Sequence, residues 1–169
     1  MASLKNELSW SFSRHKTLQA CPRRYYFRHY RHWGGWEEGA DPIAREAYRL
    51  SKLEHRPTWQ GSVVHRVIAR SLEAARLGRP VGDAEAVIEE ALGWMRQDYR
   101  DSRDDVARRS GDFKRHVRFA EHEYKQDDGS AHWRGRLKES AEIVTSALRS
   151  FFASPLYVAL ARLPDADWI

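Results

Sequence analysis

Gly61 and His65 lie four residues apart in the most regular helical stretch of the sequence. Side chains four apart share a helix face and lean toward the N-terminus, so the His65 imidazole is expected to reach back over Gly61. A glycine inside a helix costs about 1 kcal/mol relative to alanine. Two interpretations follow: the glycine leaves space for a metal ion, a ligand or another backbone, or His65 is a partly buried, hydrogen-bonded histidine at the edge of the apolar face.

A second candidate site combines basic and aromatic residues near the N-terminus. Residues 1–36 carry a net charge of +6, whereas the rest of the chain carries −1. Basic groups attract a polyanion, and the interleaved rings can either stack on bases or anchor a core. The pattern predicts a nucleic-acid-binding surface, with a structural role for the same side chains as the alternative. The predicted contact residues are Arg14, Lys16, Arg23, Arg24, Tyr26 and Arg28.

Helices must position both candidate sites, because only the residues around Trp10 alternate in the manner of a strand. Capping residues and apolar spacing predict helices over residues 14–20, 22–30, 42–53, 57–77, 83–99, 133–152 and 155–163. Ser11 or Ser13 is the predicted N-cap of the first helix, and Asp41 is that of the third. The helix over 57–77 is expected to be central. The residues predicted to face inward from the helix over 83–99 are Ala86, Val87, Ala91, Leu92 and Met95.

Composition excludes several classes of protein. A lone Cys21 rules out an internal disulfide and any metal or iron–sulfur site built from several cysteines of this chain, and it is interpreted as a small buried hydrophobe. No stretch approaches the roughly 18 apolar residues of a membrane helix, and the first six residues lack a signal-peptide core. A cytoplasmic protein without a membrane partner is expected.

Two motifs together resemble the opening of RecB-type nucleases of the PD-(D/E)XK superfamily. That opening has Ser-x-Ser, an apolar helix, then Cys-Pro-Arg-Arg and several aromatics, as in Ser9–Ser11 and Cys21–Phe27 here. A Gly-x-x-x-His motif follows after a helical spacer, and Gly61 and His65 match it. The resemblance covers residues 8–77 and implies that His65 is a metal ligand.

The resemblance also implies a particular catalytic site. In that family the histidine is the first of several Mg²⁺ or Mn²⁺ ligands. The others are an Asp and the Glu of a Glu-x-Lys motif, both on a small mixed sheet, and the Lys orients or activates the attacking water. Such carboxylates hold the hard cation against the scissile phosphate.

The later part of the sequence departs from this pattern. Glu123-Tyr124-Lys125 spells Glu-x-Lys and Asp112 precedes it, but their polar surroundings are typical of a helix end and turn, which argues against a catalytic role. No Gln-x-x-x-Tyr helix follows, and the chain stops at Ile169, about where the family's sheet would begin. We therefore expect a mainly α, single helical domain over residues 1–169. It would be the helical front of a PD-(D/E)XK nuclease-like protein, truncated after residue 169 and lacking the mixed-sheet catalytic core.

Two functions are consistent with these observations. The chain is either the N-terminal part of a metal-dependent DNA nuclease, inactive alone, or a non-catalytic helical DNA-binding or adaptor module. In the first case Mg²⁺ or Mn²⁺ binds only when a missing C-terminal region or a partner chain completes the site, and no iron–sulfur cluster is present. DNA is the expected partner in both cases.

Overall fold

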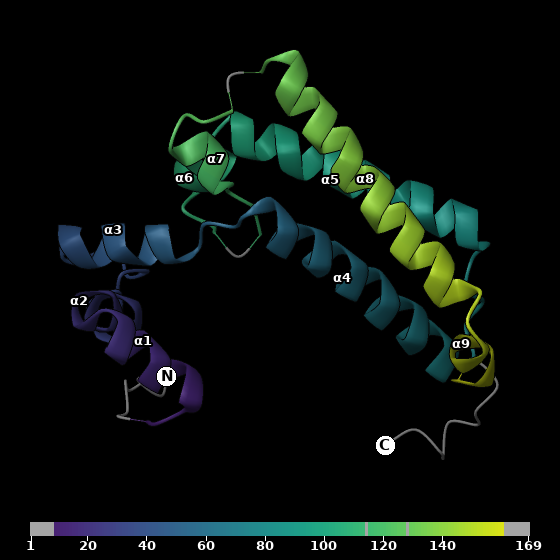
Figure 1. Ribbon diagram of the computed structural model, residues 1–169, viewed down its shortest axis with the longest axis horizontal. Helices are drawn as coiled ribbons and strands as arrows, with labels where there is room; N and C mark the ends of the chain where they lie inside the picture. The colour runs from purple at the N-terminus through teal and green to yellow at the C-terminus, as the bar shows by residue number, and fades with distance from the viewer. Residues whose placement is uncertain (1–8, 114, 128, 161–169) are drawn as a thin grey trace. The chain divides into compact units, whose positions relative to one another are not determined.

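The chain divides into two units in the computed structural model, an N-terminal unit, Met1–Leu53, and a C-terminal unit, Glu54–Ile169 (Figure 1). The structure describes residues 9–113, 115–127 and 129–160. Within these ranges the regular elements are all helices, and no strand occurs. The expected mainly α fold is confirmed for the described residues.

The N-terminal unit begins with two helices that share one capping residue. Helix α1 (Phe12–Ala20) starts at Ser11, whose Oγ accepts the backbone N–H of Arg14 at 3.2 Å. Cys21 ends α1 and also caps helix α2 (Pro22–Tyr26), because its Sγ accepts the backbone N–H of Arg24 at 3.4 Å. Cys21 is partly exposed, so its interpretation as a buried hydrophobe is wrong. Its role is to join two helices.

The second predicted helix changes its hydrogen-bonding register before it ends. A π-helical segment, η1 (Phe27–Arg31), follows α2 directly. Because a π-turn aligns groups five residues apart, the hydroxyls of Tyr25 and Tyr30 meet at 3.2 Å. This widened turn was not predicted from the sequence.

Helix α3 (Pro42–Ser51) packs against η1 through a turn that requires glycine. A side chain on Gly35 would place its Cβ 2.3 Å from the carbonyl oxygen of Ala44, so only glycine allows this close approach. Asp41 caps α3 as predicted: its Oδ1 accepts the backbone N–H groups of Ile43 at 2.9 Å and Ala44 at 3.1 Å.

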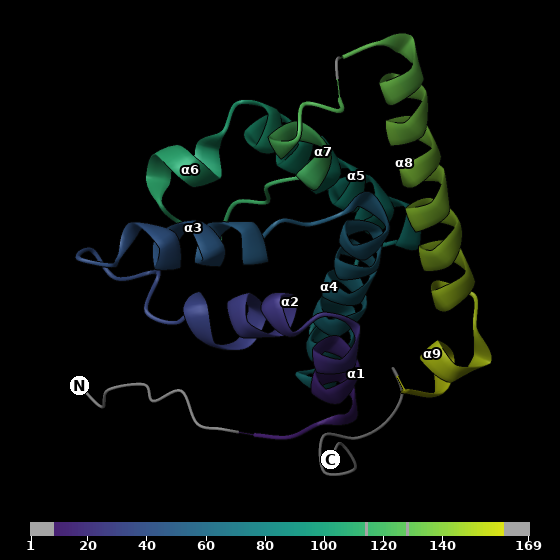
Figure 2. The same ribbon diagram turned by 60° about the vertical axis from the view of Figure 1, so that its left-hand side comes forward.

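The C-terminal unit is built on three long helices that pack together, α4 (Arg56–Arg76), α5 (Ala84–Arg103) and α8 (Ala131–Phe152) (Figures 1 and 2). Each of the three helices contacts both others, so the predicted central position of α4 is not distinguished from those of α5 and α8. No described helix has the length and apolar character needed to cross a membrane. The core consists of Trp59, Val63, Val67, Ile88, Ala91, Met95, Phe119, Val144 and Leu148.

Three short helices, α6 (Val106–Ser110), α7 (Ala120–Glu123) and α9 (Pro155–Leu160), complete the C-terminal unit. Between α6 and α7 the chain returns to the start of α4: the backbone N–H of Glu54 donates to the carbonyl of Arg118 and that of Ala120 to the carbonyl of Glu54, each at 2.9 Å. This isolated bridge brings Phe119, 2% exposed, into the core. The predicted end of the last helix, at residues 161–163, lies outside the described residues.

One predicted helix face was partly wrong. In α5 the buried residues are Ile88, Ala91, Met95 and Ser102, whereas Ala86 is exposed. The helix also continues to Arg103, four residues beyond the prediction. The extra turn matters because the fully buried Ser102 belongs to it.

Candidate nucleic-acid interface and predicted metal ligand

The predicted nucleic-acid contacts lie on the first two helices of the N-terminal unit and on η1. Arg23, Arg24 and Arg28 are exposed, and none forms an ion pair with a described residue. Lys16 lies over the ring of Phe12 at 4.6 Å, and the Arg23 guanidinium lies 5.9 Å from the ring of Phe27. These cations are therefore available to a partner.

Arg14 differs from the other predicted contacts, because it is partly buried and donates from Nη1 to the carbonyl of Ser9 at 2.9 Å. Its charge also lies close to the ring of His29. Burial and the neighbouring positive charges, Arg14 first, lower the pKa of His29. Arg14 thus shapes the electrostatics of this surface as well as adding charge to it.

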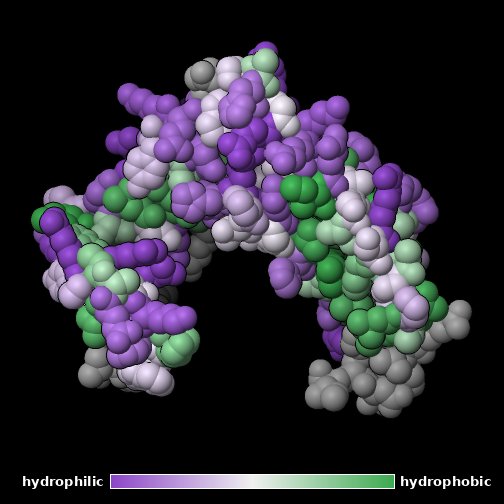
Figure 3. All heavy atoms as spheres, in the orientation of Figure 1, coloured by the Kyte–Doolittle hydropathy of each residue, from purple (hydrophilic) through white to green (hydrophobic). Residues whose placement is uncertain are grey.

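Two acidic residues of the N-terminal unit form ion pairs with arginines other than the predicted nucleic-acid contacts. Arg31 pairs with Asp41 at 2.5 Å, and Arg49 pairs with Glu46 at 2.6 Å. Glu37 and Glu38 form no ion pair with the predicted arginines in the described part of the unit. In the space-filling view, hydrophilic and hydrophobic residues are intermixed on the visible face of the N-terminal unit (Figure 3).

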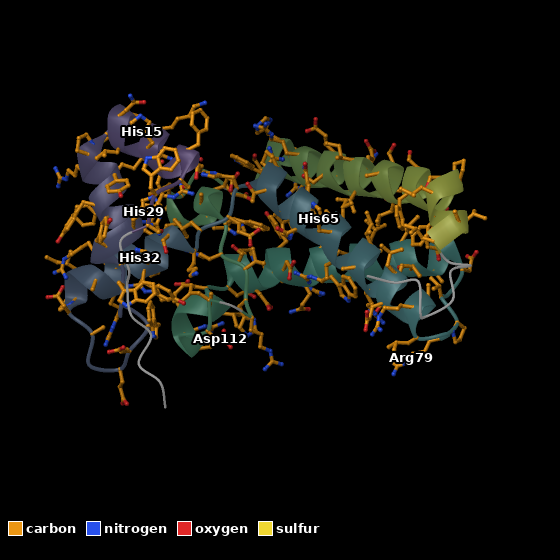
Figure 4. All side chains as sticks on the ribbon, turned by 90° about the horizontal axis from the view of Figure 1, so that it is seen from below. His15, His29, His32, His65, Arg79 and Asp112 are labelled. Carbon is orange, nitrogen blue, oxygen red and sulfur yellow. The ribbon has the colours of Figure 1, made fainter. Side chains whose placement is uncertain are left out.

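His65 is exposed on α4, on the side away from the buried Trp59, Val63 and Val67 (Figure 4). It forms no hydrogen bond with a described residue, so the interpretation as a partly buried, hydrogen-bonded histidine is wrong. A Cβ added to Gly61 would meet nothing within 4 Å. The space over Gly61 is therefore open, and the His65 ring does not come within 4 Å of that Cβ position, so the expected reach of the imidazole over Gly61 is not observed.

The other residues considered for a metal site do not converge on His65. The described residues contain no group of three or more His, Cys, Asp or Glu side chains that could hold a metal ion. Figure 4 shows Asp112 and His65 at separate places in the C-terminal unit. The carboxylate of Asp112 instead accepts the backbone N–H of Arg115 at 2.9 Å. One imidazole cannot hold a hard cation such as Mg²⁺, so the described residues do not fit a complete metal site.

The Glu-x-Lys triplet occupies a helix end and turn, as its polar surroundings predicted. Glu123 is the last residue of α7, and Lys125 follows in the left-handed region with φ 54°. The carboxylate of Glu123 accepts the Nε–H of Arg118 at 3.3 Å. An arginine partner holds this carboxylate within the fold.

A buried polar network beside the triplet was missed in the sequence. The Oγ of Ser102 lies 2.7 Å from Nδ1 of His122, whose Nε2 lies 3.2 Å from the Asp127 carboxylate. The hydroxyl of Tyr99 donates to the same carboxylate at 2.7 Å. Burial lowers the pKa of His122, and burial together with Asp127 raises the pKa of Tyr99 to about 12. Tyr99 and Ser102 lie 20 or more residues before His122 and Asp127, so no local spacing reveals the network.

The Ser–His–Asp order of this network suggests a nucleophile, but its geometry supports a structural role. Ser102 is fully buried, and its Oγ also accepts the backbone N–H of Phe119 at 2.8 Å. The serine hydrogen is then directed at Nδ1 of His122, which leaves Nε2–H to donate to Asp127. The network fixes the segment from Phe119 to Asp127 against α5.

Two half-buried acids, Glu54 and Asp98, lie near the start of α4 and on α5. The indole N–H of Trp59 donates to Asp98 at 2.9 Å. Burial, followed by the charge of Asp98, raises the pKa of Glu54, and burial raises the pKa of Asp98. Both shifts mark a site where a negative charge is costly.

Comparison with known proteins decides the family. A family model described as the PD-(D/E)XK nuclease superfamily matches residues 9–151, from just before α1 into the last turn of α8. The chain belongs to the PD-(D/E)XK nuclease superfamily. Searches of curated proteins and of solved structures found no match.

Membership of the PD-(D/E)XK superfamily gives the general chemistry. It indicates a nuclease with nucleic acid as its substrate, and nucleases of this superfamily generally use divalent metal ions. The matched span contains all six predicted nucleic-acid contacts and the Gly61–His65 motif. Both candidate sites therefore lie in the part of the chain that carries the family likeness.

Proposed function

We propose that this chain is the helical, DNA-binding part of a metal-dependent deoxyribonuclease of the RecB type, acting in the cytoplasm. The superfamily match over residues 9–151 is the observation that carries the proposal. The cations without ion-pair partners on α1, α2 and η1 support DNA as the substrate, because phosphate contacts supply most of the affinity of such proteins. The proposed contacts are Arg14, Lys16, Arg23, Arg24, Tyr26 and Arg28.

In this proposal His65 contributes one ligand to a Mg²⁺ or Mn²⁺ ion. Its exposed imidazole and the open space over Gly61 support this role. The carboxylate ligands come from a further region of the protein or from a partner chain, because the described residues supply no such set. The bound ion would polarise the scissile phosphate and activate water when the site is complete.

The proposal predicts that the purified 169-residue chain does not cleave DNA. We expect no Mg²⁺- or Mn²⁺-dependent activity above background on labelled DNA, while the same preparation still binds DNA. Glu123→Gln is the matched variant, because it removes the carboxylate of the Glu-x-Lys triplet and keeps its shape. Metal-dependent cleavage that Glu123→Gln abolishes would overturn the proposal and give the triplet a catalytic role.

The second candidate function is a non-catalytic helical DNA-binding or adaptor module. The observation that favours it is the lack of a metal-ligand set among the described residues. The two functions differ in what the gene encodes after residue 169. A continuing frame with strand–Asp–strand–Glu-x-Lys selects the nuclease, and a stop codon at that point selects the module.

A further inference from the structure

A cavity of about 300 Å³ lies between α4 and α5 in the C-terminal unit and is also lined by the loop that joins the two helices. Figure 4 marks this loop by Arg79. An apolar cavity of about 150 Å³ admits benzene, so this cavity has room for a molecule of about two fused rings. The small apolar side chains that leave this room are Val67, Ala74, Val81, Ala86 and Val87.

Ser71 supplies a buried hydroxyl to this cavity. It lines the cavity and is only 4% exposed, yet its Oγ forms no hydrogen bond with a described residue. Ser102 and Ser140, the other serines buried in the described part of the chain, differ, because the Oγ of each forms hydrogen bonds within the fold. A buried hydroxyl without a partner costs free energy, and folded proteins pair nearly all such groups. The Ser71 hydroxyl is therefore available to a molecule in the cavity.

The charged residues of the lining neutralise each other. Arg70 on α4 donates to the carboxylate of Glu90 on α5 at 2.7 Å, so an ion pair bridges the two helices at the cavity. The Arg70 guanidinium also lies 5.4 Å from the ring of Trp94, which lines the cavity farther along α5. A charged molecule would either break this pair or lie among apolar side chains without a counter-charge, and both are unfavourable. The lining therefore favours an uncharged molecule.

We infer that the cavity between α4 and α5 binds a compact, uncharged organic molecule of about two fused rings. Its rings would pack against Val67 and Val87, and a hydroxyl or carbonyl group would form a hydrogen bond with Ser71. This site goes beyond the proposed nuclease function, because neither Gly61 nor His65 lines it and all six predicted nucleic-acid contacts lie in the other unit. A bound molecule would bridge α4 and α5 and stabilise the C-terminal unit.

The test uses β-naphthol, a bicyclic probe with one hydroxyl, and naphthalene, which has the same rings without the hydroxyl. Each probe is titrated into the whole isotope-labelled chain while the amide chemical shifts are followed by NMR. We expect both probes to shift the amide signals of residues that line the cavity. Ser71→Ala should weaken β-naphthol binding by about 2- to 10-fold, because one hydrogen bond is lost, and should leave naphthalene binding unchanged.

Ala74→Leu fills the cavity and should abolish the amide shifts that either probe causes. Ala69→Leu is its matched control, because Ala69 is exposed on the same helix and does not line the cavity; this variant should bind both probes as the wild type does. Thermal unfolding checks that each variant is folded. Ser71→Ala should melt no lower than the wild type, since it removes a buried hydroxyl that lacks a hydrogen bond.

The inference is overturned when neither probe shifts the amides of the cavity, since water alone then fills it. Shifts that persist unchanged in Ala74→Leu would also overturn it, because the probes would then bind elsewhere. A β-naphthol affinity that Ser71→Ala leaves unchanged would contradict the proposed hydrogen bond. A lower melting temperature for Ser71→Ala would contradict it too, because the hydroxyl would then have a partner within the fold.

Discussion

At the scale of single residues, the arginines of the N-terminal unit fall into two groups that the sequence does not distinguish. Arg31 and Arg49 each hold an acidic partner, whereas Arg23 and Arg24 are exposed without one among the described residues. An arginine in an ion pair is already partly neutralised and contributes less to binding a polyanion. The structural alternative for Arg23 and Arg24 is thereby reduced to the contact between Arg23 and Phe27.

The double variant Arg23→Ala/Arg24→Ala tests this difference. Each neutralised phosphate releases condensed counterions, so losing two contacts should flatten the dependence of log affinity on log salt by up to about two units. Because both side chains are exposed, the melting temperature should change little. Titrations between about 50 and 200 mM salt measure the slope.

Arg31→Ala is the control for the double variant, because it removes an arginine that pairs with Asp41. Arg31→Ala should lower the melting temperature and leave the dependence of log affinity on log salt nearly unchanged. If the double variant melts earlier and keeps the wild-type slope, its arginines are structural and nucleic acid is not the partner of this surface.

His122 makes the stability of the C-terminal unit depend on pH. Burial lowers its pKa in the folded state below the ordinary value of 6.5, so the unfolded chain takes up the proton first as the pH falls. Protonation therefore favours unfolding, and we expect the contribution of His122 to the melting temperature to fall as the pH is lowered from 7 to 5. His122→Gln, which cannot be protonated in this range, should lose this contribution and should melt lower than the wild type at pH 7. Calorimetry across this pH range measures both effects.

Glu54 and Asp98 act with the opposite sign. Their pKa values are raised by burial, so the folded state binds protons before the unfolded state does, and acidification stabilises it. The wild-type curve is the sum of both effects, so the difference between wild type and His122→Gln isolates the histidine. A difference that does not change between pH 7 and pH 5 would contradict the role assigned to His122.

At the scale of elements, the helices with clear caps and apolar spacing were predictable. The π-helical segment η1 and the capping role of Cys21 were not. Ser11, one of the two caps predicted for the first helix, and Asp41 are the observed N-caps of α1 and α3, and the apolar spacing identified α4 to within one residue at each end. The switch to η1 was missed because a π-turn has no distinct local composition, and Cys21 was misread because a cysteine rarely serves as a cap.

The candidate sites, too, could be predicted only where the signal is local in the sequence. The basic residues near the N-terminus and His65 could be identified by type and spacing. All of the predicted cations except the partly buried Arg14 are exposed, as is His65, and their roles in binding stay predictions. The Ser102–His122–Asp127 network could not be identified, since it depends on how the segment after α6 returns to α5 and α4. Pairings across such sequence separations are set by tertiary packing and leave no period in the sequence.

Gly61 provides a prediction for α4 as an element. It lies inside the helix, and a Cβ there would meet nothing within 4 Å, so Gly61→Ala should stabilise the isolated chain. The gain should be about 0.5–1 kcal/mol, because alanine restricts the unfolded chain and favours the helix. For a chain of this size the melting temperature should rise by about 1–4 °C.

Gly135→Ala is the matched control for Gly61→Ala. Gly135 lies inside α8, is exposed, and also has nothing within 4 Å of its Cβ position. Gly61→Ala and Gly135→Ala should raise the free energy of unfolding by similar amounts. If only Gly135→Ala is stabilising, something approaches Gly61 closely in the isolated chain, and the open space assigned over Gly61 is wrong.

At the scale of the whole molecule, charge and core are divided between the two units. Residues 1–53 hold the whole net charge of +5, and residues 54–169 are neutral. The core cluster around Trp59 and Leu148 lies entirely in the C-terminal unit. In the N-terminal unit the buried hydrophobic residues among those described are Ala44 and Tyr48. The net positive charge and the main hydrophobic core therefore belong to different parts of the sequence.

This division predicts the behaviour of a shortened chain. Residues 54–169 alone should unfold cooperatively, because they keep three packed helices and the core cluster. Without the charged segment they should bind DNA at least about tenfold more weakly than the whole chain at 50 mM salt, since the phosphate contacts are gone. Circular dichroism during thermal unfolding and fluorescence anisotropy measure the two properties on one sample. A shortened chain that stays folded and binds as tightly as the whole chain would move the nucleic-acid interface to the C-terminal unit, where Arg66, Arg70 and Trp94 combine cations with a ring.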